Sequence, residues 1–468
     1  MRIPFVVAVG LLVALAPSAR AVEPALLPPD AALATFDTEI PGGFAQPSAR
    51  ASIDADAAVG GGALKVVFHA TDPVVPPDVL VPLAGGVDAA KTAGLSFHAK
   101  ATGGQAGEPV RLRVGLLDGT GRLILQRPHA VPADGKWQRV DLPLDRFRWG
   151  DVGGAWAEAR TLRVTIESPF AAVWLDDVRL LARKPGDPTA TESLRKLAFG
   201  DHDARVVEAD GLVVATDAPE LAEADVLRVL GNMRRARAFV RRAFGDAVRP
   251  LDAPAPAALL VFADRPRMTA FWPRAGERWG ARIVPPTAGG YTVQDVATSD
   301  YNGTKDRPVW LHESVHAIAA RDLRLSPGNP RHGWLQEGLA NYVQLCVYPQ
   351  SLPADVYPRA FAGGVQDRPQ ALFRPLRQVT AERVTAQQYA QVASVVAYLI
   401  EERPALLPAL ARGLADGEPV EKVLERAGTD VGKLEADWLA WGRKRFAAAR
   451  DDGHFAVPKE LERPAAEP

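Results

Sequence analysis

Cysteine is almost absent from this sequence of 468 residues, which contains only Cys346. A single thiol excludes an intrachain disulfide, so we expect core packing rather than cross-links to stabilise the fold. No cysteine lies near the N-terminus to carry a lipid anchor, and Cys346 sits in an apolar segment as a small buried hydrophobe. Beyond the N-terminal stretch, no run approaches the ~20 apolar residues of a transmembrane helix, so no membrane span is expected.

A strong charge of either sign is also absent, because the formal net charge is -1 with 24% charged residues. Phosphate binding requires a concentrated basic surface, and the composition therefore argues against nucleic acid as a partner. One basic cluster occurs at residues 234–242 with helical spacing. Its simplest interpretation is the solvated face of a helix, with an anionic ligand as the alternative.

The N-terminus has the features of a secretory signal peptide. Met1 and Arg2 precede an apolar stretch from Ile3 to Pro17, and small residues permit cleavage after Ala21. We therefore expect residues 1–21 to be removed and the mature protein to be secreted or periplasmic in a bacterium. The roughly 447 remaining residues predict two or three domains.

Residues 31–183 are punctuated by glycine and contain short, often alternating apolar segments with no long helical pattern. These segments are residues 64–68, 95–99, 112–117, 123–125 and 162–166. Asp118-Gly119-Thr120-Gly121 has the composition of a hairpin turn between two of them. An all-β sandwich is the fold that this pattern predicts.

Residues 136–147 and 173–180 of the same region resemble the jelly-roll modules of the galactose-binding and carbohydrate-binding type. The resemblance implies a carbohydrate ligand, held by exposed aromatic rings on which a sugar can stack. Trp149 and Trp156 are the candidates, because they fall in a loop-like stretch. A structural or protein-contacting role of the module is the alternative.

A linker at residues 184–191, rich in proline and glycine, separates this sandwich from the rest of the chain. Residues 192–450 then mix strand and helix patterns, which predicts an α+β domain with a helical C-terminal part. One predicted strand, at residues 289–293, could lie at a sheet edge and pair with an extended peptide; an ordinary sheet strand is the alternative. Residues 451–468 are polar, and we expect a mobile tail.

The most informative motif is His-Glu-x-x-His at His312, Glu313 and His316. Residues four apart share one face of a helix, so both imidazoles can bind one metal ion while Glu313 lies beside it. Twenty residues later, after a cluster of helix breakers, Glu337 opens a second apolar helix and can supply a third ligand. Three protein ligands leave a fourth position for water, which is typical of a catalytic Zn2+ site. Glu313 is then the general base, and peptide hydrolysis is the predicted reaction.

Two other residues compete with Glu337 for the role of third ligand. Asp322 occupies the position of the last ligand in the longer metzincin motif, but Ala319 replaces the glycine that would turn the chain there. The helix therefore continues and carries Asp322 away from the metal. His332 is a weaker candidate and is expected at the surface or on the substrate side.

The residues from Trp334 to Tyr342, read together with the His-Glu-x-x-His motif and with Tyr389, look like the gluzincin superfamily, and more closely like bacterial exported peptidase MA-like domains. The resemblance implies that His312, His316 and Glu337 bind zinc and that Glu313 is the base. It also implies that Tyr389 is similar to the tyrosine that steadies the oxyanion in aminopeptidase N relatives.

The sequence departs from those relatives in one respect, because it lacks their upstream Gly-x-Met-x-Asn motif. Endopeptidase action, or cleavage of a cell-wall peptide or glycoprotein, is therefore at least as well supported as aminopeptidase activity, and an exopeptidase of another kind stays open. The leading hypothesis is a zinc metallopeptidase that acts on a peptide or protein. The alternative is a carbohydrate- or surface-binding protein that retains the gluzincin fold without catalysis.

Overall fold

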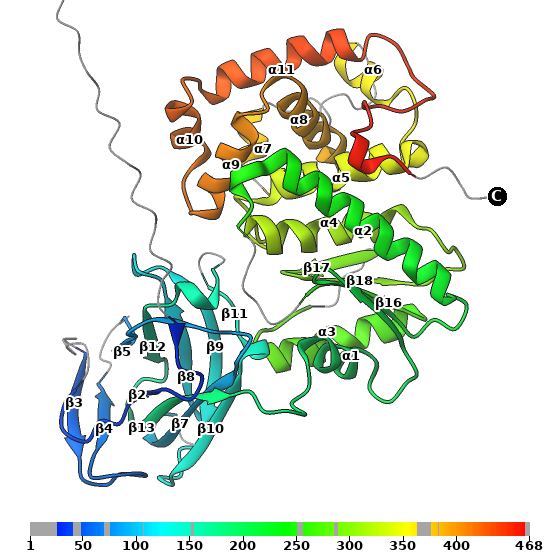
Figure 1. The fold of residues 1–468 in the computed structure, drawn as a ribbon. Coiled ribbons are helices and arrows are strands. Elements are labelled where there is room, and N and C mark those ends of the chain that lie inside the picture. Colours follow the sequence, from blue (N-terminus) through cyan, green and yellow to red (C-terminus); the bar gives the residue numbers. More distant parts are fainter. Residues whose placement is uncertain are drawn as a thin grey trace, which may run out of the picture.

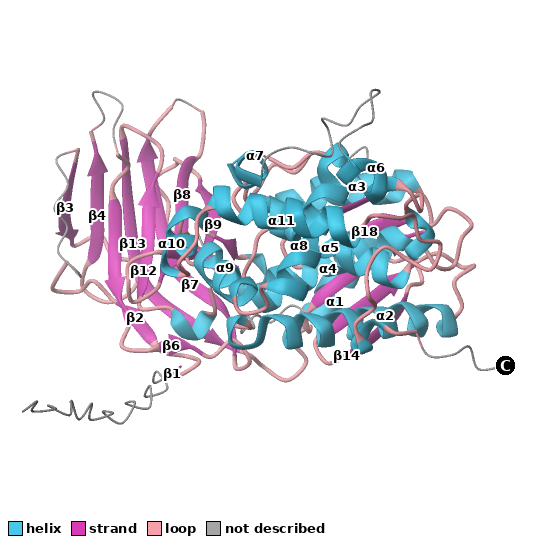
Figure 2. Ribbon diagram, turned by 90° about the horizontal axis from the view of Figure 1, so that it is seen from above, coloured by secondary structure: helices cyan, strands magenta, loops and turns pink. Residues whose placement is uncertain are grey.

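The computed structural model of this chain describes residues 26–40, 48–69, 75–105, 107–150, 154–249, 256–284, 289–362, 376–381 and 383–463. The predicted signal peptide at residues 1–21 lies outside them. A part built of β-sheets comes first, and a part that combines one sheet with many helices follows (Figure 1). Seen from above, the strands of the first part stand beside the helices of the second (Figure 2).

Thirteen strands and two short 3-10 helices form the N-terminal part as far as it is described. They are β1 (Leu26–Leu27), β2 (Ala32–Ala34), β3 (Ala49–Asp54), β4 (Ala63–Phe68), β5 (Asp78–Pro82), β6 (Gly86–Val87), β7 (Thr92–Gly103), β8 (Val110–Leu117), β9 (Leu123–Val131), β10 (Gln138–Pro143), η1 (Leu144–Arg146), β11 (Arg148–Trp149), η2 (Trp156–Glu158), β12 (Thr161–Ile166) and β13 (Ala171–Ala182).

Two antiparallel sheets dominate this part. One has the order β10-β7-β13-β4-β3, with β2 pairing β13, and the other has the order β11-β9-β8-β12-β5. Alternate side chains of both sheets meet in one apolar core, such as Phe97 from β7, Val114 from β8 and Val173 from β13. Successive side chains of a strand point to opposite faces, so each sheet buries one face and leaves the other outside. This arrangement agrees with the expected β-sandwich.

The second part contains a five-stranded mixed sheet. Its strands are β14 (Arg205–Ala209), β15 (Leu212–Thr216), β16 (Ala257–Phe262), β17 (Gly290–Val293) and β18 (Val296–Asp300), in the order β14-β15-β16-β18-β17. The three central strands are parallel, and β14 and β17 are antiparallel edge strands.

Eleven α-helices are described in this part, with short 3-10 turns between them. They are α1 (Ala190–Phe199), α2 (Glu223–Phe244), η3 (Gly245–Ala247), α3 (Arg265–Trp279), α4 (Pro308–Leu323), α5 (Gly333–Val347), η4 (Pro349–Ser351), α6 (Val356–Ala362), α7 (Leu376–Ala381), η6 (Ala386–Gln388), α8 (Tyr389–Glu402), α9 (Leu406–Ala415), α10 (Val420–Arg426), α11 (Val431–Arg445) and η7 (Lys459–Leu461).

Helices cover both faces of the mixed sheet. Val214 and Leu259 point to the face covered by α2 and α4, within the largest apolar core. Val213 and Leu260 point the other way and pack with Phe271 of α3 in a separate core. Because both faces are buried, β15 and β16 are nearly continuous apolar runs rather than alternating ones.

Helices α5 and α8 cross closely, which places their N-terminal residues beside α4. The close approach depends on Gly338, because a Cβ there would come within 2.7 Å of the carbonyl oxygen of Val392. This crossing, far from obvious in the sequence, brings the third predicted ligand and Tyr389 to the same region.

The segment that we expected to be a mobile tail is packed against the second part. Phe455 and Leu461 are buried in the large core, and the guanidinium of Arg463 lies 4.2 Å above the ring of Tyr348. The expectation is wrong for residues 451–463, because two apolar side chains in a polar segment suffice to anchor it; residues 464–468 lie outside the described part. Likewise, α1 begins at Ala190, within the predicted linker, with Thr189 and Glu192 forming its capping box.

None of the helices among the described residues is both long and apolar enough to cross a membrane.

Candidate metal centre

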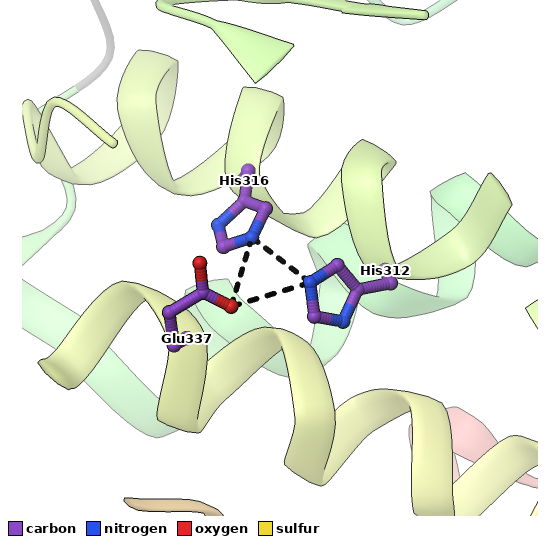
Figure 3. Close-up of side chains that lie close together, drawn as sticks. All are labelled: His312, His316 and Glu337. Atoms are coloured by element: carbon purple, nitrogen blue, oxygen red, sulfur yellow. Dashed lines mark hydrogen bonds and ion pairs between the residues drawn. The ribbon is translucent and has the colours of Figure 1, made fainter. Parts of the chain in front are cut away.

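Helix α4 carries two of the three predicted ligands. Pro308 occupies its first turn, where the missing N–H removes no intrahelical hydrogen bond. The helix then packs between the mixed sheet and the other helices, so that even polar residues such as His312 and His316 are buried. One turn of separation places the two imidazoles on the same side of α4 (Figure 3).

Helix α5 brings Glu337 to the same point. The Nε2 atoms of His312 and His316 are 3.1 Å apart, and Glu337 Oε2 lies 3.3 Å from the first and 3.5 Å from the second. Figure 3 shows these three atoms as a triangle between the two helices. Atoms that bind one tetrahedral zinc ion at ~2.0–2.2 Å lie roughly 3.3–3.6 Å from one another, so the donor atoms fit such an ion.

The electrostatics of the three side chains are consistent with a site for a cation. Burial works to lower the pKa of His316, but its interactions with Glu337, Glu313 and Gln336 together outweigh burial and raise that pKa to about 9. Burial likewise works to raise the pKa of Glu337, but the interactions of its carboxylate with His316 and His312 together outweigh burial and lower that pKa well below its usual range. Glu337 Oε2 is buried and accepts no hydrogen bond within the described part of the chain. A positive charge at the centre of the triangle would satisfy it.

Gln336 orients the ring of His316 through Nδ1, the nitrogen that is not part of the triangle. Its Oε1 atom accepts a hydrogen bond of 2.9 Å from His316 Nδ1, and its Nε2 atom donates to the carbonyl oxygen of Leu325. Nδ1 therefore carries a proton, and Nε2 of His316 binds a metal once the second proton of the ring, which the carboxylate of Glu337 favours, has been released. Gln336 is almost fully buried, so its amide has little freedom to turn away.

We expect Gln336→Leu to weaken zinc binding by roughly 10- to 100-fold, because the ring of His316 would lose the partner that holds it. The measurement is a competition titration of the metal-free chain with a zinc chelator of known affinity. Gln344→Leu, a substitution on the same helix away from the triangle, serves as the control and should not change the affinity. Equal affinities for both variants would argue against an orienting role of Gln336.

Glu313, the predicted base, is held by the edge strand β17. Its Oε2 atom accepts a hydrogen bond of 2.6 Å from the hydroxyl of Thr292, whose oxygen also lies 3.1 Å from the backbone oxygen of Glu313. Gly290, on the same strand, leaves room for this carboxylate, since a Cβ there would lie 2.5 Å from Glu313 Cγ. Strand β17 and helix α4 thus restrict the position of the Glu313 carboxyl group.

Tyr389 lies at the start of α8, next to the triangle. Its ring centroid is 6.0 Å from that of His312, and the two ring planes are inclined by 32°. Burial, followed by the negative charges of Glu337 and Glu313, raises the pKa of Tyr389 well above its usual value. The phenol therefore keeps its proton at neutral pH and can donate a hydrogen bond.

The structure places Asp322 away from the triangle. Its carboxylate receives Arg237 of α2 through two contacts, Nε to Oδ2 at 2.7 Å and Nη2 to Oδ1 at 2.9 Å, and Arg241 Nε adds a third at 3.2 Å. This pair also changes the interpretation of the basic cluster. Arg237 is 7% exposed, so that position is a buried partner of Asp322 rather than part of a solvated face.

His332 is not a surface residue, contrary to the expectation. It is buried, and its Nδ1 atom accepts a 2.8 Å hydrogen bond from the backbone N–H of Ser326. Its Nε2 atom is 3.0 Å from the carbonyl oxygen of Leu414, and burial lowers its pKa. Both ring nitrogens of His332 therefore have backbone partners, one in the loop between α4 and α5 and the other in α9. Cys346, also buried, has its pKa raised by burial to about 12 and is unreactive, as expected of a core residue.

Of the two tryptophans proposed to stack on a sugar, Trp156 is buried in the sandwich core, where its ring meets the edge of Phe147 at a centroid distance of 5.0 Å. Trp156 is therefore not a stacking platform. Trp149 is in β11, and its side chain lies outside the described part.

Two contributors to the site were missed from the sequence, Thr292 and Gln336 as partners of Glu313 and His316. Gln336 directly precedes Glu337, and its position before a ligand was a usable signal. No signal in the sequence pointed to Thr292, because its contact with Glu313 joins a strand and a helix that are adjacent only in the folded chain.

No family model and no curated protein matches this chain. Similar solved structures are carbohydrate-binding modules and glycoside hydrolases. The family 11 carbohydrate-binding module of a Clostridium thermocellum cellulosomal cellulase is 15% identical, covers 35% of this chain and 99% of its own, and has a TM-score of 0.27. A family 30 carbohydrate-binding module is 16% identical over 36% of this chain and 96% of its own, with a TM-score of 0.27. An exo-β-agarase is 14% identical over 40% of this chain and 37% of its own, also with a TM-score of 0.27. Similarity at this level carries no functional assignment.

Proposed function

We propose that this chain is an exported zinc-dependent metallopeptidase. The observation that carries the proposal is the grouping of His312, His316 and Glu337, whose ligand atoms all lie within 4.8 Å of one another. Two neutral imidazoles and one carboxylate, drawn from two helices, are a donor set that zinc prefers in catalytic sites. The N-terminal residues 1–21 supply the export signal in this proposal.

In this proposal each residue of the site has a separate role in hydrolysis. Zinc held by the triangle would polarise the substrate carbonyl and acidify a water molecule. Glu313 accepts the proton of the attacking water and returns it to the leaving amine, while Thr292 holds its carboxylate in place. The neutral phenol of Tyr389 donates a hydrogen bond to the oxygen on which negative charge develops.

A peptide is the substrate that the surroundings of Glu313 suit best. β17 is an edge strand, and β18 is its one sheet neighbour among the described strands. The free backbone groups of an edge strand can pair with an extended peptide. Because β17 contacts Glu313 through Thr292 and Gly290, a peptide paired with this strand would pass close to the base.

Hydrolysis of an unfolded, fluorescently labelled protein by the mature chain tests this proposal. We expect activity that a zinc chelator abolishes and that added zinc restores. Activity that survives removal of the metal would argue against it, as would the absence of hydrolysis in a chain that holds one zinc ion. Absence of hydrolysis in a chain that holds one zinc ion would favour the alternative, a carbohydrate- or surface-binding protein without catalysis.

We also propose that the N-terminal sandwich binds carbohydrate through its outer face, as an accessory to catalysis. A group of aromatic and charged side chains gathers there. Trp174 Nε1 donates to Asp54 at 2.9 Å, Trp137 Nε1 donates to Asp56 at 3.1 Å, and Lys100 lies over both indole rings. Trp137 is partly exposed, so its ring can offer a stacking surface beside charged hydrogen-bonding groups.

Trp137→Ala should reduce retention on immobilised mixed-linkage β-glucan, because it removes the partly exposed ring of this group. Affinity electrophoresis in gels with and without polysaccharide provides the comparison. Lys136→Ala, at the exposed neighbouring position, is the matched control and should migrate like the wild-type chain. Wild-type migration that is insensitive to a panel of plant and bacterial polysaccharides would argue against carbohydrate binding.

A further inference from the structure

The C-terminal end of α4, the helix that carries His312 and His316, is in contact with the sandwich. Ala320 of this helix is fully buried and packs in the apolar core of the sandwich. Arg324, which directly follows the last turn of α4, forms a two-pronged ion pair with Glu158 of η2. Its Nη1 atom lies 2.7 Å from Oε2 of the carboxylate, and its Nη2 atom lies 2.7 Å from Oε1. The metal-binding helix is thus joined to the sandwich by both an apolar and a charged contact.

Glu158 is itself firmly held by the sandwich. The side chain of Trp156, in the same short helix, is buried in the sandwich core. A Cβ on Gly86 of β6 would come within 2.0 Å of the carbonyl oxygen of Ala157, so β6 and η2 are in direct contact. Oε2 of Glu158 also accepts a hydrogen bond of 3.2 Å from the backbone N–H of Ala155. The carboxylate that receives the arginine is therefore a fixed acceptor.

Arg324 has a backbone conformation that benefits from such an acceptor. Its φ is 58°, in the left-handed region that residues other than glycine adopt at a cost. The side chain is 8% exposed, and its Nε atom donates a hydrogen bond of 3.0 Å to the carbonyl oxygen of Arg249. A bidentate pair between a guanidinium and a carboxylate is among the stronger ion pairs in proteins. The pair with Glu158 therefore stabilises the direction in which the chain leaves α4.

The chain that leaves α4 leads back to the metal triangle. Leu325, the residue after Arg324, is fully buried, and its carbonyl oxygen accepts a hydrogen bond from Nε2 of Gln336. Oε1 of the same amide accepts the hydrogen bond of 2.9 Å from Nδ1 of His316. Because the amide group is planar and rigid, a shift of the Leu325 carbonyl would also shift the oxygen that holds the imidazole. A short series of contacts thus connects Glu158 with a metal ligand.

A second contact from the sandwich supports the same loop from the other side. Nη1 of Arg122, between β8 and β9, donates a hydrogen bond of 3.3 Å to the carbonyl oxygen of Asp416, which directly follows α9. Near the end of α9, the carbonyl oxygen of Leu414 lies 3.0 Å from Nε2 of His332 in the loop between α4 and α5. The sandwich therefore contacts both segments that hold this loop.

We propose that Glu158 and Arg324 are positioning residues of the metal centre. Through Leu325 and Gln336, their ion pair fixes the orientation in which the ring of His316 meets the metal. This inference rests on the zinc site of the proposed metallopeptidase. The sandwich is then a structural component of the metal centre, and the two parts act as one unit rather than as an enzyme with a detachable module.

Glu158→Gln should weaken zinc binding by the full chain roughly 3- to 10-fold. The loss should be smaller than for Gln336→Leu, because Glu158 acts on the ligand through additional contacts. The measurement is the competition titration of the metal-free chain with a zinc chelator. Asp145→Asn is the matched control, because it breaks another ion pair across the same junction, with Arg278 of α3, a helix without a metal ligand. Equal losses in the two variants would show only a general effect of loosening the junction and would contradict the proposal.

A double-mutant cycle tests the route through Gln336. In a chain that already carries Gln336→Leu, the additional change Glu158→Gln should alter the zinc affinity by less than about twofold, since the connecting amide is gone. The same loss in both backgrounds would overturn the proposed route. If Glu158→Gln fails to fold, Arg324→Lys takes its place in both experiments, because lysine keeps the charge and loses the paired geometry.

Cobalt(II) bound in place of zinc provides a readout that requires neither hydrolysis nor a change in stability, because its visible absorption depends on the arrangement of the ligands. We expect a shifted absorption spectrum in Glu158→Gln and the wild-type spectrum in Asp145→Asn. If the wild-type chain binds zinc but Glu158→Gln has unchanged affinity or an unchanged cobalt spectrum, this inference is wrong and the proposed peptidase stands. A wild-type chain that binds no zinc would overturn both.

Discussion

Glu337→Ala should reduce the zinc content of the purified mature chain from about one ion per molecule to nearly none. The substitution removes the one ligand of the triangle that comes from α5 and the only anionic one. Two imidazoles at 3.1 Å would remain, and a site with two neutral ligands holds zinc far more weakly than one with three. The measurement is metal analysis after dialysis against a weak chelator.

Two companion variants make this result specific. Glu402→Ala, an exposed carboxylate at the end of α8, should retain the full zinc content. Asp322→Asn should also retain it, because that carboxylate faces Arg237 and Arg241. It should instead lower the free energy of unfolding by about 3–5 kcal/mol, since a buried ion pair loses one partner. Loss of zinc in the Asp322 variant, with retention in the Glu337 variant, would reassign the third ligand.

Glu313→Gln should lower kcat/KM by about 10²- to 10⁴-fold, the contribution typical of a general base, while leaving about one zinc ion per chain. Glutamine keeps the volume of the side chain, and its carbonyl oxygen can still accept the hydrogen bond from Thr292, so the local structure should persist. Only the ability to take up a proton is lost. Steady-state kinetics on the substrate found by the chelator-sensitive assay, together with metal analysis, separate the two properties.

Thr292→Val tests the surroundings of Glu313 in the same assay. We expect a smaller loss than for Glu313→Gln, with recovery in Thr292→Ser, because the hydroxyl positions the carboxylate without replacing it. If Glu313→Gln retained wild-type activity, Glu313 would not be the base and the proposed mechanism would be wrong.

Local sequence patterns predicted secondary structure around the site. The segment predicted as a strand at residues 289–293 corresponds to β17. Periodicity of apolar residues is a property of neighbouring positions, so a sequence displays it directly. For the same reason, the four-residue spacing of His312 and His316 was sufficient to place both imidazoles on one face of a helix.

The errors have a common cause, since each concerns a contact between distant segments. His332 was expected at the surface or on the substrate side, yet it is buried, and its Nε2 atom lies 3.0 Å from the carbonyl oxygen of Leu414 in α9, far along the chain. Arg237 was assigned to a solvated face because its neighbours are basic, yet it is buried against Asp322. In both cases a polar side chain is buried because it has a partner, and the partner is not visible in the local sequence.

The sequence by itself determined which residues offer ligand atoms for a metal, which helix carries the pair of histidines, and that a β-rich part precedes an α+β part. These are consequences of residue chemistry and of the periods of 3.6 and 2 residues. Only the tertiary structure decided that Glu337 completes the triangle and that Thr292 and Gln336 hold Glu313 and His316. Those outcomes depend on how α4, α5, α8 and β17 pack, because packing selects the few long-range contacts that local preferences leave open.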